Sequence, residues 1–519
     1  MSTFSFLKQL ITLSLIARQA LCLSVSIPVA APSTAPTLAP DLVSISIEQD
    51  RWTDYVGTTS RNQFFFNTLE NLNQLTGKPP RFRIGADSED RTDFSPAVQF
   101  AENVFPAFSN TTPYPEASEN IVGDGYYQAA QWLPPNTHVV WGVNFKTLNI
   151  TTAFLNAKSM VKAFASPAMK ASGITLDAFE IGNEADFYNS VLSQYVTNWN
   201  TFATNLTATG KLSKSSTTKF WGGAFGGDSH TTNGFSPQGL ITAGILSSTP
   251  GSLITTMSVH RYSGSFCQGS GGLLQDLMTK STIRGNLTGF TPDIAAVKAK
   301  GLDFVLGETN SYACHGAPGV SNTAGAALWT LDYALFAPQI GISRVYFHQG
   351  IGYKYSMIQP ATLTRSPLDG STLSAPLAPH VQSQYYGAIV AAEAIGNSGS
   401  TRAVELSINN SFIAGYAFYV GNKLARALLI NSQAFLTTTT TARTSTLVNL
   451  GLTGAGAPTK MSIKRLSIPH ADATSGLKWG GQTYETSDGK VSGSLQVTTA
   501  NVASGVEIQE TEAVLLTFL

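Results

Sequence analysis

The chain has 519 residues, of which 43% are hydrophobic and only 12% are charged. This length exceeds one ordinary domain and suits a large barrel with an accessory domain. Lysine plus arginine equals aspartate plus glutamate, at 32 each, so no net charge attracts the protein to nucleic acid or to an anionic membrane. Neither is expected as a partner, and the oligomeric state stays open.

The first 22 residues have the features of a secretory signal peptide. Lys8 precedes an apolar stretch from Leu10 to Ile16, and Ala20-Leu21-Cys22 offers a small-residue cleavage site. A membrane anchor is the alternative, but the stretch is too short to span a bilayer. We therefore expect a secreted, extracellular protein. Residues 23–40 are rich in Pro, Ala and Thr and are expected to form a linker.

Residues 41–396 alternate short apolar runs with helical ones. The first run is LVSISIE, at 42–48, and a helix is expected at 61–75. Further strands are expected at 81–85, 138–145, 176–184, 219–225, 254–262, 302–308 and 342–349. Eight strands rich in Val, Ile and Phe and joined by helices predict an α/β fold, a parallel (β/α)₈ TIM barrel. The rival doubly wound sheet would need a glycine-rich phosphate loop after the first strand, and none is present.

After about Gly396 the pattern changes. Residues 397–519 contain short alternating runs, such as SFIAGYAFYV, KLARALLIN and KMSIKRLSI, with turn residues between them. We expect a C-terminal antiparallel β-sandwich domain, joined by a strand from the N-terminal segment.

Two glutamates follow strand-like runs: Glu184 in FEIGNEADFY and Glu308 in FVLGETNSY. They lie about 120 residues apart, which is about three strand–helix units of roughly 30–40 residues each in a barrel with insertions. This spacing places them at the ends of the fourth and seventh strands, on opposite sides of the barrel mouth. Two facing carboxylates there are suited to cleaving a glycosidic bond.

Two polar residues support this pair. Asn183 directly precedes Glu184 and can bind the 2-hydroxyl group of a sugar. Tyr262, in SVHRYSG at the end of the sixth strand, is placed to donate its phenol O–H to Glu308 and to keep that carboxylate ionised. Each signal is weak alone, and their combination at neighbouring strand ends carries the prediction.

These motifs resemble the retaining glycosidases whose acid/base lies in an Asn-Glu on the fourth strand and whose nucleophile ends the seventh. Within that clan the chain is similar to glycoside hydrolase family 79, the β-glucuronidases and heparanase-like enzymes. The resemblance covers SIEQDRW, RIGADSED, EIGNE, HRYSG, GETNSYACHG and the terminal sandwich. It implies that Glu184 is the acid/base and Glu308 the nucleophile.

The resemblance also implies substrate-binding residues. Tyr312, backbone amides at Ala313 and Cys314, and His348 and Tyr355 match the positions that hold the substrate carboxylate. Asp87 matches a position that binds sugar hydroxyls, although RIGADSED departs from the more usual Arg-x-Gly-Gly-Asn pattern.

Cysteines and sequons fit an exported protein. If Cys22 leaves with the signal, Cys267 and Cys314 remain, on loops after neighbouring strands, and are expected to form a disulfide. Sequons occur at Asn110, Asn149, Asn205, Asn286 and Asn409. The seven histidines are scattered without metal-ligand spacing, so neither a metal nor another cofactor is expected.

The sequence thus predicts a secreted retaining exo-β-glucuronidase that acts on terminal glucuronate, or its 4-O-methyl ether, of arabinogalactan-like glycans. One alternative is a heparanase-like endo-enzyme, against which the sparse Lys and Arg argue. A second is a clan member acting on neutral sugars. A third is a catalytically inactive carbohydrate-binding protein, against which the two intact glutamates argue.

Overall fold

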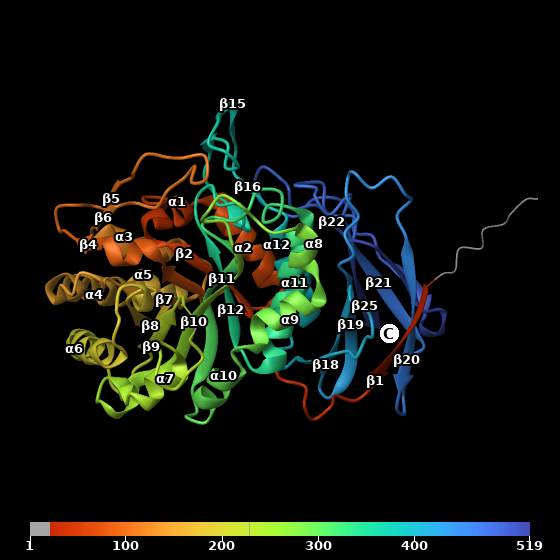
Figure 1. Ribbon diagram of the computed structural model, residues 1–519, viewed down its shortest axis with the longest axis horizontal. Coiled ribbons are helices and arrows are strands. Elements are labelled where there is room, and N and C mark those ends of the chain that lie inside the picture. Colours follow the sequence, from red (N-terminus) through yellow and green to blue (C-terminus); the bar gives the residue numbers. More distant parts are fainter. Residues whose placement is uncertain (1–20, 228) are drawn as a thin grey trace, which may run out of the picture.

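The computed structural model describes residues 21–227 and 229–519. The segment expected to be a signal peptide lies almost wholly outside this range, so that expectation remains a prediction. The described chain forms two bodies side by side, a barrel built from the first part and a sandwich built from the last (Figure 1). Within the described ranges, no helix is both long and apolar enough to cross a membrane.

The first body is a closed barrel of eight strands, and each neighbouring pair is parallel. All eight predicted strands are present, and β12 pairs with β2 to close the circle. Five barrel strands contribute one buried residue each to a cluster inside the barrel, which is therefore a packed core and not a pore; these residues are Val140, Ala178, Trp221, Val305 and Tyr346. The strands are β2 (Val43–Glu48), β3 (Phe82–Gly85), β7 (His138–Val143), β8 (Thr175–Ile181), β9 (Lys219–Phe225), β10 (Ile254–Ser265), β11 (Asp303–Ala313) and β12 (Arg344–Gln349).

Helices surround the barrel, and their ends follow local sequence signals. The first predicted helix, α2 (Gln63–Thr76), starts after Asn62, whose side chain accepts a hydrogen bond from the Phe65 N–H, and it ends at Gly77 in the left-handed conformation. The other main helices are α4 (Ile150–Phe164), α6 (Leu192–Gly210), α7 (Pro237–Thr242), α9 (Lys280–Thr288), α10 (Thr291–Lys298), α11 (Ala324–Ile340) and α12 (Gln384–Ile395). Shorter ones are α1 (Trp52–Val56), α3 (Asp124–Gln128), α5 (Pro167–Ser172) and α8 (Leu274–Met278).

Three small strand assemblies were not anticipated from the sequence. A three-stranded sheet follows β3, and a hairpin after β12 projects beyond the body of the barrel (Figure 1). Both follow the carboxyl ends of barrel strands, so they add walls on the face where such barrels bind substrate. The strands are β4 (Thr92–Phe94), β5 (Ala101–Val104) and β6 (Glu119–Val122) in the sheet, β14 (Leu363–Arg365) and β15 (Thr372–Leu377) in the hairpin, and the short pair β13 (Ile358–Gln359) and β16 (His380–Val381).

The C-terminal body is the expected sandwich, with an antiparallel sheet of seven strands against a sheet of three. Alternating apolar residues of the two sheets form its separate core. Its strands are β17 (Arg402–Glu405), β18 (Ile413–Val420), β19 (Lys423–Asn431), β20 (Ser445–Thr453), β21 (Lys460–Ser467), β22 (Lys478–Trp479), β23 (Thr498–Asn501), β24 (Val506–Gln509) and β25 (Glu512–Phe518).

The structure corrects the linker expected at residues 23–40. Leu21–Pro28 is a strand, β1, that pairs in parallel with β20 of the sandwich. Val25 and Ile27 are 1% and 0% exposed in the sandwich core, because the alternation of apolar and polar residues in this segment gives it one apolar face. Bridges from Ala30 and Thr37 to the sandwich then hold the rest of the segment against it.

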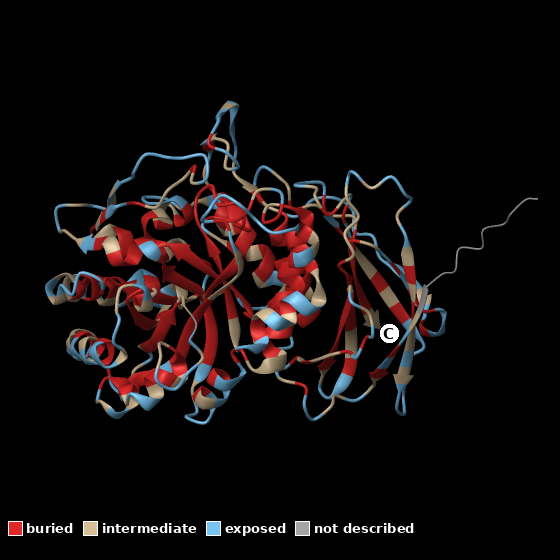
Figure 2. Cartoon of the chain, viewed as in Figure 1, coloured by how far each residue is buried: buried red, intermediate tan, exposed pale blue. Residues whose placement is uncertain are grey.

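A buried polar network connects the two bodies. Arg284 of α9 forms a bidentate pair with Asp332 of α11 and reaches Glu405 of β17 at 2.6 Å. Tyr416 of β18 donates to Asp332 at 2.6 Å. Figure 2 shows the helices between barrel and sandwich mostly in the colour of buried residues. The interface is therefore packed and charge-paired, which holds the two bodies in one arrangement.

Candidate active site

Glu308 lies within β11, and its two carboxylate oxygens are both occupied by donors. Tyr262, on the neighbouring β10, donates its hydroxyl to Oε1 at 2.7 Å, as the sequence suggested. Arg83 of β3 donates from Nη1 to Oε2 at 2.6 Å. The carboxylate is only 6% exposed, so these two donors fix its orientation inside the barrel mouth.

The charges around Glu308 favour its ionised form. Burial alone would raise the pKa of Glu308, but the charges of His348, His260 and Arg83, in this order of size, and the hydrogen bond from Tyr262 outweigh burial and lower the pKa to about 2. His348 Nδ1 lies 3.8 Å from Glu308 Oε2, and its Nε2 lies 3.3 Å from Glu48. These two carboxylates outweigh the burial of His348 and raise the pKa of its ring, which favours the cationic imidazolium.

Glu184 follows β8 in a turn that the backbone makes unusual. Gly182 has a φ of 81° and Glu184 itself a φ of 46°, a left-handed conformation that is uncommon for a residue with a side chain. The Glu184 N–H donates to Ala224 O at 2.8 Å, which anchors the turn on β9. His260 Nδ1 of β10 lies 2.9 Å from Glu184 Oε1 and orients the carboxyl group.

The surroundings of Glu184 favour its protonated form. Burial, and after it the negative charge of Glu308, raise the pKa of Glu184 well above its usual value. His260 offers no compensating charge at neutral pH, because burial lowers its pKa to about 4. One carboxyl group of the pair is thus held protonated and the other ionised.

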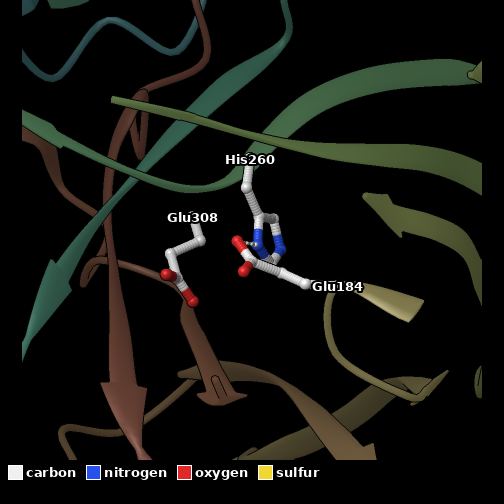
Figure 3. A group of neighbouring side chains, drawn as sticks. All are labelled: Glu184, His260 and Glu308. Carbon is white, nitrogen blue, oxygen red and sulfur yellow. Dashed lines mark hydrogen bonds and ion pairs between the residues drawn. The ribbon is translucent and has the colours of Figure 1, made fainter. Parts of the chain in front are cut away.

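The two glutamates face each other across the mouth of the barrel. One carboxylate oxygen of each and a ring nitrogen of His260 all lie within 4.8 Å of one another, and Figure 3 shows the three side chains converging. Such a triad could also ligate a cation, but Arg83 and Tyr262 already take both oxygens of Glu308. Carboxylate oxygens within 4.8 Å of each other fit the close pair of glycosidases that retain configuration, roughly 5–5.5 Å apart, better than the roughly 6.5–9.5 Å of those that invert it.

A cavity of about 470 Å³ opens above this pair. Its wall is rich in carboxyl groups, from Glu48, Asp87 and Glu116, which suits the many hydroxyl groups of a sugar. Its other lining residues are Thr112, Glu184, Phe187, Gly226, Arg261, Tyr262, Cys267, Glu308, Ala313, Cys314, His315, His348 and Tyr355.

Most of the expected substrate-binding residues lie at this cavity. Asp87, Tyr262, His348 and Tyr355 line it. Asn183 lies just behind the wall, where its Oδ1 accepts from Arg83 at 2.8 Å and its Nδ2 donates to Asp87 at 3.2 Å. These two bonds fix the orientation of the Asn183 amide, with its oxygen toward Arg83 and its nitrogen toward Asp87.

Tyr312 is the exception, and its expected role at the substrate carboxylate remains a prediction. Its side chain is not among those that line the cavity. The ring instead packs over Gly264 and Gly272, where an added Cβ would come within 2.4 Å and 2.0 Å of Tyr312 atoms. The ring occupies space that side chains at these two positions would fill, and it therefore packs outside the cavity. The neighbouring Ala313 and Cys314 do line the cavity, as expected.

Several residues of the site were not identified from the sequence. Arg83 is fully buried and contacts Glu180, Asn183 and Glu308, so it holds both catalytic strands together. A detectable signal was present: an arginine in the middle of the buried strand RFRIG needs a carboxylate partner. His260 stands in the motif HRYSG, but nothing in that motif indicates that its ring reaches Glu184.

A second buried pair completes the wall. His315 Nε2 lies 2.6 Å from Glu116 Oε1, and its ring stacks on Tyr353 with centroids 3.9 Å apart. Tyr353 also donates to Glu116 at 3.0 Å. His315 thus shapes the cavity wall together with a carboxylate from a distant loop.

The loops that carry these residues are tied by the expected disulfide between Cys267 and Cys314, whose Cα atoms lie 5.1 Å apart. The sequon asparagines differ in setting. Asn110 and Asn409 are exposed in loops, and Asn149 is exposed at the start of α4. Asn205 lies within α6, and Asn286 lies within α9 bonded to Arg261 at 3.3 Å. Glycosylation of all five remains a prediction.

Comparisons with known proteins agree with this geometry. The glycosyl hydrolase family 79 C-terminal β domain matches residues 415–515. A β-glucuronidase of Neurospora crassa is 27% identical over 495 residues, covering 85% of this chain and 84% of the relative. A β-glucuronidase of Aspergillus niger is 27% identical over 498 residues, covering 89% and 86%.

Solved structures extend the likeness to both bodies. The 4-O-α-L-rhamnosyl-β-D-glucuronidase from Fusarium oxysporum 12S, solved with Rha-GlcA, superposes with a TM-score of 0.78 at 25% identity, covering 96% of this chain and 100% of that one. A GH51 arabinofuranosidase from Xanthomonas axonopodis pv. citri has a TM-score of 0.62 at 14% identity, covering 96% and 100%, which shows the shared fold alone.

Proposed function

We propose that this chain, which the family model and its relatives assign to glycoside hydrolase family 79, is a secreted retaining exo-β-glucuronidase. It is a glycoside hydrolase, and its relatives are named as β-glucuronidases. The observation that carries the proposal is the pair of facing carboxyl groups, one held ionised and one held protonated within one cavity. Export is supported by the N-terminal sequence, the sequons and the disulfide.

In the first step the ionised Glu308 attacks the anomeric carbon while Glu184 gives its proton to the glycosidic oxygen. The aglycone leaves as an alcohol, and a glycosyl ester forms on Glu308. Tyr262 and Arg83 orient the attacking carboxylate, and His260 orients the acid. In the second step Glu184, now ionised, takes a proton from water, and the water oxygen displaces Glu308 from the anomeric carbon.

The depths of the two glutamates support exo action. The Glu308 side chain is 8% exposed and that of Glu184 is 19% exposed, so the acid lies nearer the solvent. Because the acid must touch the glycosidic oxygen, the aglycone lies toward the opening and the cleaved sugar lies inside. The inner wall of Glu48, Asp87 and Glu116 can then bind the hydroxyls of one terminal residue.

A uronate carboxylate also needs donors inside the cavity, because a buried anion without partners is too costly. The cationic ring of His348, the phenol of Tyr355 and the backbone at Ala313, Cys314 and His315 supply positive charge or donors on one side of the cavity. Terminal glucuronate, or its 4-O-methyl ether, on an arabinogalactan-like glycan is therefore the proposed substrate.

Nitrophenyl glycosides test the proposal. The β-glucuronide should be cleaved much faster than the β-glucoside, β-galactoside or α-arabinofuranoside. In Tyr355→Phe, loss of one donor to a charged group should cost about 1.5–3 kcal/mol, or roughly 10- to 150-fold in kcat/KM on the glucuronide alone. Equal rates on glucuronide and glucoside would refute the proposal. His348→Ala is a poorer test, because His348 also stabilises Glu308 and its loss should slow every sugar.

A second candidate rests on the structural neighbour from Fusarium oxysporum, whose name describes removal of a 4-O-rhamnosylated glucuronate. In this chain the same cavity would have to accept a second sugar on the 4-hydroxyl. Glucuronides with a free, a methylated and a rhamnosylated 4-hydroxyl, compared at equal concentration, separate these two candidates. A heparanase-like endo action is disfavoured, because Arg261 is the one Lys or Arg among the residues that line the described cavity.

A further inference from the structure

Phe187 is the most exposed aromatic side chain beside the catalytic pair. It is 68% exposed, although it follows Glu184 by only three residues and lines the same cavity. Exposure of so large an apolar surface to water is unfavourable, and a ligand that covers the ring would remove that surface from water. Its place in the wall of the cavity is what matters, because ligand sites are lined mainly by apolar and aromatic side chains.

Other exposed phenylalanines at this end of the barrel are covered by cations. The Arg51 guanidinium lies 3.9 Å from the ring centroid of Phe105, and Arg365 lies 4.0 Å from that of Phe108. No such cation and no aromatic ring packs on Phe187 within the described part of the chain. Its ring is therefore available to a ligand, whereas the other two are already engaged.

The ring stands on a rigid base. Phe187 ends a short 3-10 turn, Ala185–Phe187, and its N–H donates to Glu184 O at 3.0 Å. The carboxylate of Asp186 accepts the N–H groups of Gly226 at 3.1 Å and Gly227 at 2.6 Å. This clamp joins the turn to the loop after β9, so Phe187 keeps a fixed position relative to the acid.

The same loop leaves room for the ring. A Cβ added to Gly226 would lie 2.8 Å from Phe187 Cε2, and one added to Gly227 would lie 3.2 Å from Cε1. The ring thus rests against glycine backbone, where most side chains would displace it. Arg261 and Thr112 line the cavity together with Phe187 and offer polar groups to the same ligand.

The chemistry of the reaction says which ligand this is. Glu184 must touch the glycosidic oxygen, so the first sugar of the leaving group lies next to Glu184 and on the solvent side of it. Pyranoses have a face of C–H groups that packs on aromatic rings, whereas their hydroxyls point outward to polar partners. We propose that Phe187 is the platform for the leaving sugar, and that the enzyme prefers glucuronides whose leaving group is a pyranose.

This inference rests on the proposed glucuronidase activity, and two substrates separate it from that activity. One is glucuronosyl-β-1,6-galactose, and the other is methyl β-glucuronide, whose aglycone is too small to stack. Nitrophenyl glycosides are avoided because their own ring would stack on Phe187. In Phe187→Ala, kcat/KM should fall about 5- to 30-fold on the disaccharide and less than about twofold on the methyl glycoside.

Two control variants accompany it. Phe187→Tyr should restore the preference, because it keeps the ring. Phe108→Ala removes a ring of comparable exposure that is packed on Arg365, and it should change neither substrate. A general loss of folding would instead lower both substrates together.

A second readout follows from the return step. In the presence of a β-galactoside or methanol, the glycosyl enzyme passes its sugar to the acceptor oxygen, while Glu184 takes the hydroxyl proton and the bond to Glu308 breaks. Phe187→Ala should lose transfer to the galactoside and keep transfer to methanol.

Equal losses on the disaccharide and the methyl glycoside, or no loss on either, would overturn the inference while leaving the glucuronidase function intact. If wild-type enzyme cleaves neither glucuronide, the proposed function is wrong. In that case the nitrophenyl panel identifies the sugar that is cleaved, and the test is repeated with that sugar linked to galactose and to methanol. A selective loss of kcat/KM on the galactose-linked substrate in Phe187→Ala would again support the platform, and equal losses would overturn it.

Discussion

Removing the hydroxyl group of Tyr262 should move the acid limb of the pH–rate profile. In the native site Tyr262 donates to Glu308 at 2.7 Å, and the pKa of Glu308 is lowered to about 2. Because activity needs Glu308 ionised, the rate is lost as pH falls through this pKa. The native limb therefore lies below the pH range in which most proteins stay folded, and the profile should be flat down to about pH 4.

The size of the shift follows from the lost bond. A hydrogen bond to a charged group contributes about 1.5–3 kcal/mol, and 1.36 kcal/mol corresponds to one pKa unit, so Tyr262→Phe should raise the pKa of Glu308 by about 1–2 units. Arg83 and His348 remain in the variant and keep the pKa from rising further. A limb at about pH 3–4 should appear where the native enzyme shows none.

The assay is kcat/KM for a nitrophenyl glycoside from pH 3 to 8, with each sample quenched in base before the phenolate is read. Tyr333→Phe is the matched control, since Tyr333 is also buried but contacts Thr309 at 2.9 Å and not Glu308. Both variants need an unchanged melting temperature. If Tyr262→Phe slows the enzyme equally at every pH, its hydroxyl does not hold Glu308 ionised and the reasoning is wrong.

Three further outcomes are expected. Glu308→Ala should be inactive on all substrates. Glu184→Ala should still form the glycosyl enzyme from activated substrates and should give a β-glycosyl azide when azide is added. Equal inactivity of both variants would contradict the assigned roles. The alkaline limb of the native enzyme should report the raised pKa of Glu184 and vanish in that variant, and a persisting limb would assign it elsewhere. Arg284→Met should lower the midpoint of thermal unfolding, because losing one partner of a buried pair costs about 3–5 kcal/mol. The control is Lys280→Met, which should change the midpoint less, because the Lys280 ammonium donates to a backbone carbonyl.

The barrel could be predicted because its strands are buried on both faces. Such strands read as continuous apolar runs, and each predicted run coincides with an observed one. The sandwich was expected to include a strand from the N-terminal segment, and β1 is that strand. Its residues were expected in the signal peptide and linker instead, because its alternating residues lie beside a segment with the features of a signal peptide and before a proline-rich stretch. The sheet β4–β6 and the hairpin β14–β15 were missed because their strands are short and because their pairing depends on packing against the barrel, which the local sequence does not reveal.

The site divides in the same way. Glu184, Glu308 and Tyr262 could be found because they stand at the ends of recognisable strands. Arg83 and His260 serve the glutamates through space, and no spacing in the sequence links them. The direction of the Tyr312 ring could not be predicted, because it depends on two glycines in other segments, at 264 and 272, that leave space for it.

The pairing of β1 with β20 also constrains how the protein can be made. The first described strand must wait for a partner that the ribosome delivers only near the end of synthesis, so the sandwich cannot be completed while the chain is still growing. Contacts between such distant segments slow folding, and unpaired strand edges favour aggregation in the meantime. A fragment cut after the barrel would keep β1 without its neighbour, and a fragment of the sandwich alone would lack that strand. To express the sandwich alone, residues 21–28 would have to be joined to it. To express the barrel alone, the same residues would have to be removed.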